Sequence, residues 1–198
     1  MFSAAHIVGG LAPALDSGTR WMMDNNQFTG DFTFYRWMSQ LIKYHKYRDT
    51  CLGIPIPDEV GDALATLQMF GQYYAGVRDL GYPVAFVSQN GITPAITPWD
   101  LFDVLFVGGD DAHKLGPEAG LMIAEAKNRR KWVHVGRVNS YQRITQFWMA
   151  DSVDGSGLIR DAGGQRAERL ASYSAAIQYA NAKNNGNVTA TNQYGLGV

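Results

Sequence analysis

A chain of 198 residues with 46% hydrophobic content is long enough for one well-buried core and short for two, so we expect a single domain. The formal net charge of −1 excludes a global basic field, and any nucleic-acid binding would therefore depend on a local patch. The single cysteine, Cys51, excludes an intrachain disulfide and a Cys-rich zinc site, and its place at the start of an apolar run predicts a buried, unreactive thiol.

Short apolar runs rich in β-branched and aromatic residues recur along the chain. Each is followed by Gly, Asp or Asn and then by a segment of helical periodicity, which is typical of β/α units. We expect seven strands, at residues 6–8, 21–23, 52–56, 84–88, 104–107, 132–135 and 147–150.

Helices are expected between these strands, at residues 32–47, 62–80, 117–130 and 141–145. In residues 62–80 the apolar side chains recur three or four positions apart and form one core-facing stripe. Residues 90–101 predict a loop with a helical turn capped near Thr97. An Ala-rich helix is expected at 166–183, which would end the domain at residue 183 and leave 184–198 as a flexible tail.

Parallel strands that alternate with helices form either a barrel or a doubly wound open sheet, and periodicity does not choose between them. In both architectures the active site lies at the carboxyl ends of the strands. Polar residues directly after the expected strands are therefore the first candidates: Asp24, Asp58, Gln89, Asp110, Asp111, Arg137, Asn139, Ser140, Asp151 and Asp154.

Acidic residues follow five of these strands, and neither a Gly-x-Gly-x-x-Gly turn nor a Gly-x-x-x-x-Gly-Lys loop is present. This pattern disfavours a dinucleotide or P-loop site and suits carboxylate chemistry at a sugar carbon. Two carboxylates that face one glycosidic bond can divide nucleophilic and acid/base roles. The alternative is structural, because Asp after a strand is also an ordinary helix cap or turn former, as Asp58 and Asp154 could be.

The remaining charged residues allow two interpretations. The four histidines lack zinc-site spacing, and His134, inside an apolar run, predicts a satisfied structural histidine. The basic residues near 127–131 form either a solvated helix end or a patch that contacts phosphates. The expected nucleic-acid-binding set is Lys114, Arg129, Arg130, Lys131 and Arg137.

The order of the strand-end motifs over residues 21–157 resembles the catalytic barrel of tRNA-guanine transglycosylases, and it is closest to the phage-type DpdA branch that places 7-deazaguanines in DNA. Asp24 in Asp-Asn-Asn-Gln-Phe is similar to the family's Asp-Ser/Thr-Gly-Gly-Phe/Tyr-Gln motif, whose aspartate is the general acid/base. Asp151-Ser152 resembles the family's Phe-Asp-Cys/Ser, whose aspartate is the nucleophile, and Asp154 is the alternative nucleophile.

Other positions resemble the family's base-binding motifs. Asp58-Glu59 is similar to an Asp-Glu pair whose aspartate accepts hydrogen bonds from the base edge, and Gln89-Asn90-Gly91 is similar to a Gln-Gly-Gly that contacts the base carbonyl. Gly108-Gly109 resembles a glycine turn that approaches the heterocycle. The substrate-binding residues implied by the resemblance are Asp58, Gln89, Gly108, Gly109, Asn25 and Asp154.

The resemblance implies an α/β fold, a compact TIM-like barrel of parallel strands that lacks the family's zinc subdomain. The implied activity is a DNA transglycosylase that exchanges guanine for a 7-deazaguanine such as preQ0 in phage DNA through a covalent glycosyl-aspartate, without a metal or other cofactor. The target base would have to be flipped out or single-stranded. Three alternatives remain: a tRNA-guanine transglycosylase, a nucleoside or base hydrolase, and a non-catalytic barrel subunit that binds nucleic acid.

Partners and location follow the same reasoning. DNA is the expected polymer and tRNA the weaker candidate, and a homodimer stays open because members of the superfamily commonly dimerise. No basic segment followed by a long apolar stretch begins the sequence, and no window approaches eighteen uninterrupted apolar residues. We therefore expect a soluble cytoplasmic protein without a membrane partner.

Overall fold

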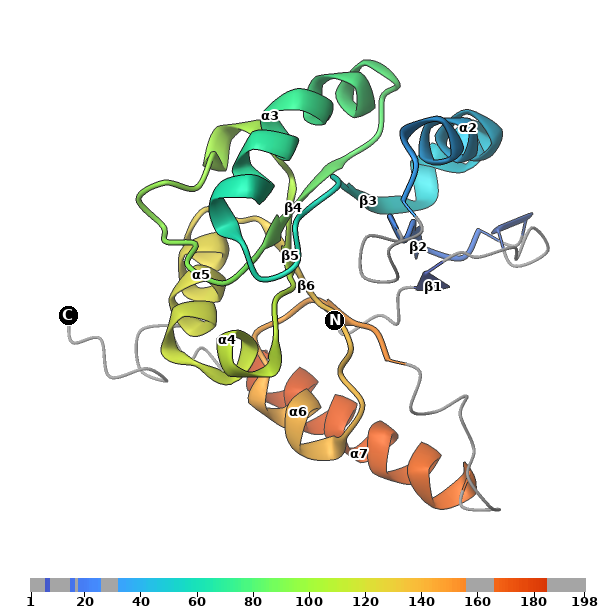
Figure 1. Ribbon diagram of the computed structural model, residues 1–198. Coiled ribbons are helices and arrows are strands. Elements are labelled where there is room, and N and C mark those ends of the chain that lie inside the picture. Colours follow the sequence, from blue (N-terminus) through green and yellow to red (C-terminus); the bar gives the residue numbers. More distant parts are fainter. Residues whose placement is uncertain (1–5, 8–14, 17, 26–31, 156–165, 185–198) are drawn as a thin grey trace.

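The structure, a computed structural model, describes residues 6–7, 15–16, 18–25, 32–155 and 166–184 (Figure 1). The expected tail lies outside these residues except for residue 184, which ends a helix. Among the described helices, none combines the length and the apolar character that crossing a membrane requires.

Seven parallel strands form one sheet in strictly sequential order: β1 (His6–Ile7), β2 (Trp21–Met22), β3 (Cys51–Pro55), β4 (Val84–Ser88), β5 (Val104–Val107), β6 (Trp132–Val135) and β7 (Ser152–Val153). Each strand pairs with its chain neighbours, and the order never reverses. A doubly wound sheet would reverse its order at a switch point, so this topology is that of a barrel wall. Within the described part of the chain β1 and β7 have one strand neighbour each, and the sheet is a curled half-barrel rather than a closed one.

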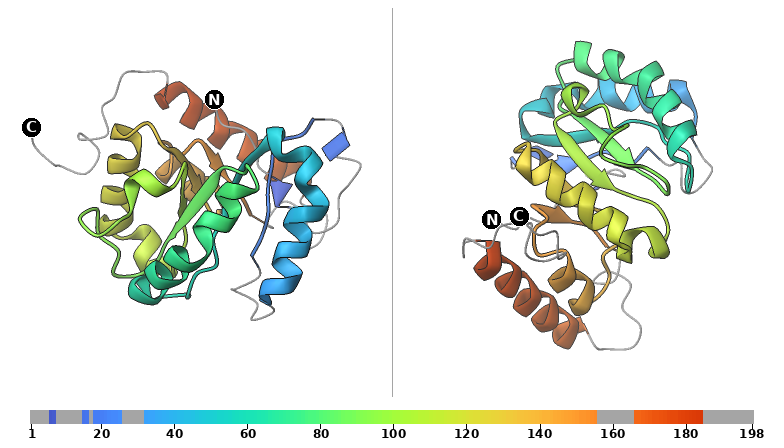
Figure 2. Two further views of the ribbon diagram at one scale, coloured as in Figure 1. Left: turned by 90° about the horizontal axis from the view of Figure 1, so that it is seen from above. Right: turned by 90° about the vertical axis from the view of Figure 1, so that its left-hand side faces the viewer.

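The helices lie around the outside of this curved row of strands (Figures 1 and 2). This arrangement follows from the sequential order, because right-handed crossovers that all run in one direction place every helix on the same face. The helices are α2 (Phe34–Tyr44), α3 (Ala63–Asp79), α4 (Asp111–Leu115), α5 (Pro117–Asn128), α6 (Tyr141–Gln146) and α7 (Arg166–Asn184), with 3₁₀ turns η1 (His45–Thr50) and η2 (Trp99–Leu101).

Local sequence explains where the central helices begin. The Asp62 carboxylate accepts hydrogen bonds from the backbone N–H groups of Leu64 and Ala65, at 2.9 and 3.0 Å, and so caps α3. Asp110 caps α4 in the same way through the N–H of His113, at 2.8 Å. Helix α5 begins with Pro117, which has no backbone N–H to leave unsatisfied in the first turn.

The two faces of the sheet bury different side chains. Outward-facing residues such as Phe86 and Leu105 join the main core beneath the helices, where Phe70, Phe86 and Phe102 pack with ring centroids 5.1 to 6.4 Å apart. The inner face carries a second, smaller cluster of Met22, Ala85 and Val104 against Leu52, Phe106 and Trp132. Gly53 also lies on this face, where a Cβ would come within 2.9 Å of Val104 Cγ2.

The strands expected at 84–88, 104–107 and 132–135 are confirmed, but the last expected strand is wrong. Residues 147–150 form a turn after α6, and β7 begins two residues later, at Ser152. All four side chains of that turn are buried, so the apolar run reflects a core-filling turn rather than a strand. The shift decides the site, because Asp151 now precedes the last strand and Asp154 follows it.

Candidate functional site

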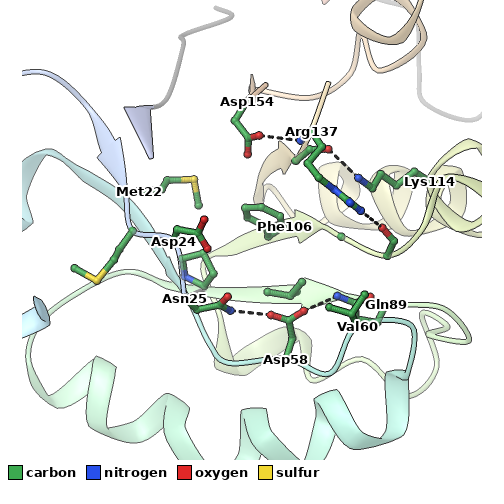
Figure 3. Close-up of a pocket in the computed structure, with 16 residues that line it drawn as sticks. Met22, Asp24, Asn25, Asp58, Val60, Gln89, Phe106, Lys114, Arg137 and Asp154 are labelled. Atoms are coloured by element: carbon green, nitrogen blue, oxygen red, sulfur yellow. Dashed lines mark hydrogen bonds between the residues drawn. The ribbon is translucent and has the colours of Figure 1, made fainter. Parts of the chain in front are cut away.

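A pocket opens at the carboxyl ends of the strands, on the inner side of the half-barrel (Figure 3). Six of the seven strands, β2 to β7, contribute residues at or shortly after their carboxyl ends, and α4 contributes one lysine. The residues that line the pocket are Met22, Met23, Asp24, Asn25, Pro55, Asp58, Val60, Val87, Gln89, Phe106, Gly108, Gly109, Lys114, Gly136, Arg137 and Asp154.

Asp58 is the centre of a buried amide–carboxylate cluster on one wall of the pocket. Its Oδ1 accepts from Asn25 Nδ2 at 2.7 Å and its Oδ2 from Gln89 Nε2 at 2.5 Å, as Figure 3 shows. Burial raises the pKa of the Asp58 carboxyl, the two amide hydrogen bonds oppose that rise, and the charge of Asp24 adds to it. Asp58 is thus not a helix cap, since Asp62 has that role, but a buried acceptor held in place by two amides.

Gln89 is fixed at both ends of its amide. Its Oε1 accepts from the N–H of Gly61 at 2.9 Å while its Nε2 donates to Asp58, so the amide orientation is determined by its partners. Gly108 packs tightly beside it, because an added Cβ would lie 2.8 Å from Val87 Cγ1 and 3.0 Å from Gln89 Nε2. Gly109 has a φ of 79°, a backbone conformation that favours glycine. The glycine turn therefore presents backbone directly to the pocket.

Asp154 lies on the opposite wall and is held through both of its oxygens. Oδ1 accepts from the backbone N–H of Arg137 at 2.8 Å, and Oδ2 is 2.9 Å from Nε2 of His134. Burial raises the pKa of Asp154, but the hydrogen bonds from His134 and Arg137 and the charge of Lys114 outweigh it, and the net pKa is below the ordinary value. Asp154 is therefore a partly buried carboxylate that stays ionised.

A chain of hydrogen bonds supports Asp154 from inside the half-barrel. His134 is fully buried, and its Nδ1 lies 2.8 Å from Ser152 Oγ, which also accepts from Trp132 Nε1 at 3.0 Å. The two ring nitrogens of His134 are thus both paired, Nε2 with the Asp154 carboxylate and Nδ1 with the Ser152 hydroxyl. The prediction of a satisfied structural histidine is confirmed, and its partner is a pocket carboxylate.

Asp24 lies two residues after β2 and is exposed, and its side chain faces the pocket (Figure 3). The pocket thus contains three carboxylates with different surroundings. Asp58 is buried among amides, Asp154 is partly buried against an imidazole, and Asp24 is exposed to solvent.

Asp151 is not part of this pocket, which corrects the expectation that it faces Asp24. Its carboxylate accepts from Lys127 Nζ at 2.7 and 2.8 Å and from the N–H of Val133 at 2.8 Å. These partners lie at the end of α5 and the start of β6, so Asp151 is at the amino end of the strands. The physical reason is the position of β7, which places the two aspartates on opposite sides of that strand.

The five basic residues that were expected to bind nucleic acid also lie at opposite ends of the strands. Lys114 and Arg137 line the pocket, and Lys114 is only 3% exposed, so it is not a surface contact for phosphates. Arg129, Arg130 and Lys131 lie between α5 and β6, at the opposite end of the strands. There Arg129 pairs with Glu125 at 2.6 Å, and Lys131 Nζ donates to the Phe102 carbonyl at 2.6 Å. These residues do not form one patch.

Sequence reasoning did not assign His134, Ser152 or Phe106 to the site. His134 and Phe106 occupy inward positions on neighbouring strands, with ring centroids 4.8 Å apart, and Ser152 is aligned with His134 across β6 and β7. Period-two alternation places His134 on the same face as Trp132, but its partners depend on the register of β7. That register is a tertiary property, and no local signal gives it.

Within the described residues no group of three or more His, Cys, Asp or Glu side chains is arranged to hold a metal ion. In comparisons with known proteins, the chain matches no protein-family model and no curated sequence. What the fold and the site define is a parallel half-barrel with three carboxylates and a buried lysine in one pocket at the carboxyl ends of its strands.

Proposed function

We propose that this protein is a base-exchange transglycosylase that replaces guanine in DNA by a 7-deazaguanine base such as preQ0, with Asp154 as the nucleophile. One observation carries the proposal. Asp24 and Asp154 line the same pocket as a third carboxylate, Asp58, which the amides of Asn25 and Gln89 hold in place.

The reaction divides into two displacements at C1′ of the target nucleotide. A carboxylate oxygen of Asp154 attacks C1′, the C1′–N9 bond breaks with its electron pair on N9, and Asp24 delivers the proton that leaves neutral guanine. A 7-deazaguanine then replaces guanine, loses its N9 proton to Asp24, and attacks C1′ as the bond to Asp154 breaks. Two inversions give net retention, and the enzyme returns to its starting protonation state.

The surroundings of Asp154 support its role as nucleophile. Its pKa is below the ordinary value despite burial, so the carboxylate is ionised when the substrate arrives. The N–H groups of His134 and Arg137 hold its two oxygens and can also stabilise the carboxylate as it leaves in the second displacement. Asp24 is exposed at the pocket, so solvent reaches its carboxyl group.

The opposite wall supports recognition of guanine. A carboxylate can accept from the ring N1–H and the 2-amino group together, and Asp58 retains acceptor capacity beyond its two amide contacts. The Phe106 ring offers apolar surface for a face of a flat heterocycle (Figure 3). DNA as the polymer rests on the resemblance to the phage-type branch, and the target nucleotide would enter the pocket by base flipping.

The test is mass spectrometry of nucleosides after incubation of the protein with preQ0 and either a DNA duplex, single-stranded DNA or tRNA. Exchange on DNA that Asp154→Asn and Asp24→Asn abolish, with a glycosyl adduct on Asp154 in the intact protein, is the expected result. Asp151→Asn is the matched control, a carboxylate removed outside the pocket, and should retain exchange. Release of guanine with an abasic site would identify a hydrolase instead. Exchange confined to tRNA would show that the polymer substrate is tRNA and not DNA.

If every polymer stays unmodified while the protein binds DNA, the non-catalytic subunit becomes the better interpretation. Thermal unfolding of each variant accompanies the assay, so that loss of activity is compared among equally folded proteins. A native-like melting temperature for Asp154→Asn with undiminished exchange would overturn the assignment of the nucleophile.

A further inference from the structure

The pocket has a cationic side that the proposed exchange steps do not use. Lys114, from the short helix α4, faces the pocket beside Arg137, across from Asp58 and its amide partners (Figure 3). The Phe106 ring lies between these two walls. A ligand that fills the space would therefore meet a carboxylate on one edge and an ammonium on the other.

Lys114 is buried without a direct carboxylate partner. It is 3% exposed, and its Nζ donates to the Gly136 carbonyl at 3.0 Å, which uses one of its three N–H groups. In the described part of the chain it forms no ion pair. The two nearby acids are engaged elsewhere: Asp111 with Arg143 at 2.6 Å, and Asp154 with His134 and the Arg137 backbone.

A buried ammonium is costly unless a partner of opposite charge or strong acceptor character meets it. Burial lowers the pKa of Lys114 to about 8, with the charge of Arg137 acting in the same direction. The ammonium is still mainly protonated at neutral pH. The pocket therefore contains a cation that can donate further hydrogen bonds to a ligand.

The geometry of the expected base identifies where that acceptor would be. In a 7-deazaguanine, the substituent at position 7 lies on the side of the ring system opposite the 2-amino group. When Asp58 holds the N1–H and 2-amino edge, position 7 is directed to the opposite wall. Building on the proposed function, we propose that Lys114 binds an anionic or strongly accepting substituent at position 7, a carboxylate, carboxamide or nitrile, and rejects a cationic aminomethyl group.

The test is direct binding of free bases to the full chain by isothermal titration calorimetry, without turnover. The probes are 7-carboxy-, 7-carbamoyl-, 7-cyano- and 7-aminomethyl-7-deazaguanine. The wild type should bind the first three at least about tenfold more tightly than the aminomethyl base, because a charge-assisted hydrogen bond replaces a repulsion. Lys114→Met should abolish the preference, and Lys114→Arg should retain it. Lys131→Met, a lysine at the other end of the strands, is the matched control and should leave the preference unchanged.

A second pair of ligands, dGMP and deoxyguanosine, shows whether Lys114 binds a nucleotide phosphate or the substituent on the base. If Lys114→Met weakens binding of dGMP relative to deoxyguanosine while the order of the bases is unchanged, the lysine binds phosphate and the proposal is overturned. Equal affinity of wild type and Lys114→Met for every base also overturns it. Should Lys114→Met unfold, Lys114→Gln is measured in its place.

Failure of this inference is distinguishable from failure of the proposed function. Bases that bind and exchange without any dependence on Lys114 refute the inference alone. Absence of binding for all four bases, together with absence of exchange, refutes both.

Discussion

Replacement of Asp151 should lower stability and leave the proposed base exchange intact. The carboxylate of Asp151 joins three chain segments, since it accepts from Lys127 at 2.7 and 2.8 Å and from the N–H of Val133 at 2.8 Å, while its own N–H donates to the Val133 carbonyl. Its side chain is 19% exposed and that of Lys127 is 31% exposed, so solvent screens the pair only in part. None of these contacts reaches the pocket.

The expected magnitude follows from the groups that lose partners. In Asp151→Ala the charged hydrogen bond is lost, and the N–H of the fully buried Val133 is left without an acceptor. Together these effects cost about 2–4 kcal/mol in the free energy of unfolding, which for a chain of this size lowers Tm by roughly 5–15 °C. Asp151→Asn keeps an acceptor for Val133 and loses only the charge, so its cost should be about 1 kcal/mol.

Thermal unfolding followed by circular dichroism should give the highest Tm for the wild type, a lower one for Asp151→Asn and the lowest for Asp151→Ala. Exchange is measured by nucleoside mass spectrometry at a temperature well below the lowest Tm. Asp154→Asn in the same assay should lose exchange. An Asp151→Asn protein with the wild-type Tm and no exchange would refute this reasoning, because it would make Asp151 chemical rather than structural.

Three further predictions concern the pocket and the basic residues. His134→Leu should move the acid limb of the proposed exchange rate to higher pH. The hydrogen bond from His134 lowers the pKa of Asp154, so its loss raises that pKa, and the carboxylate is then protonated at a higher pH; an unchanged acid limb in the pH–rate profile would contradict this. Gly109→Ala should weaken base binding and lower the free energy of unfolding by about 1–3 kcal/mol, because φ is 79° and the Cβ would lie 2.7 Å from His113 Cδ2; unchanged calorimetry and Tm would contradict this. Alanine at all three positions 129–131 should leave DNA affinity and its salt dependence unchanged in fluorescence anisotropy, since these residues lie at the far end of the strands from the pocket; a smaller salt slope would show that they contact phosphates.

Much of the β/α framework can be predicted from local patterns. The strands at 84–88, 104–107 and 132–135 are compact apolar runs bounded by polar or glycine residues, and helix α3 follows a capping aspartate. The error at residues 147–150 has a physical cause, since a buried turn and a buried strand have the same composition. The short helix α4 was not expected, although Asp110 gives it a cap.

The sequence by itself determined that polar residues follow a series of parallel strands, and this was enough to bring Asp24, Asp58, Gln89 and the Gly108-Gly109 turn to one edge of the sheet. Only the tertiary structure showed that Asp154 lines the pocket and Asp151 does not, because their positions depend on where β7 pairs with β6. It also decided that His134 supports Asp154 and that Lys114 is buried at the pocket. Periodicity encodes which face a residue occupies, whereas strand register and helix placement arise from packing between distant segments, and the contacts of a site depend on both.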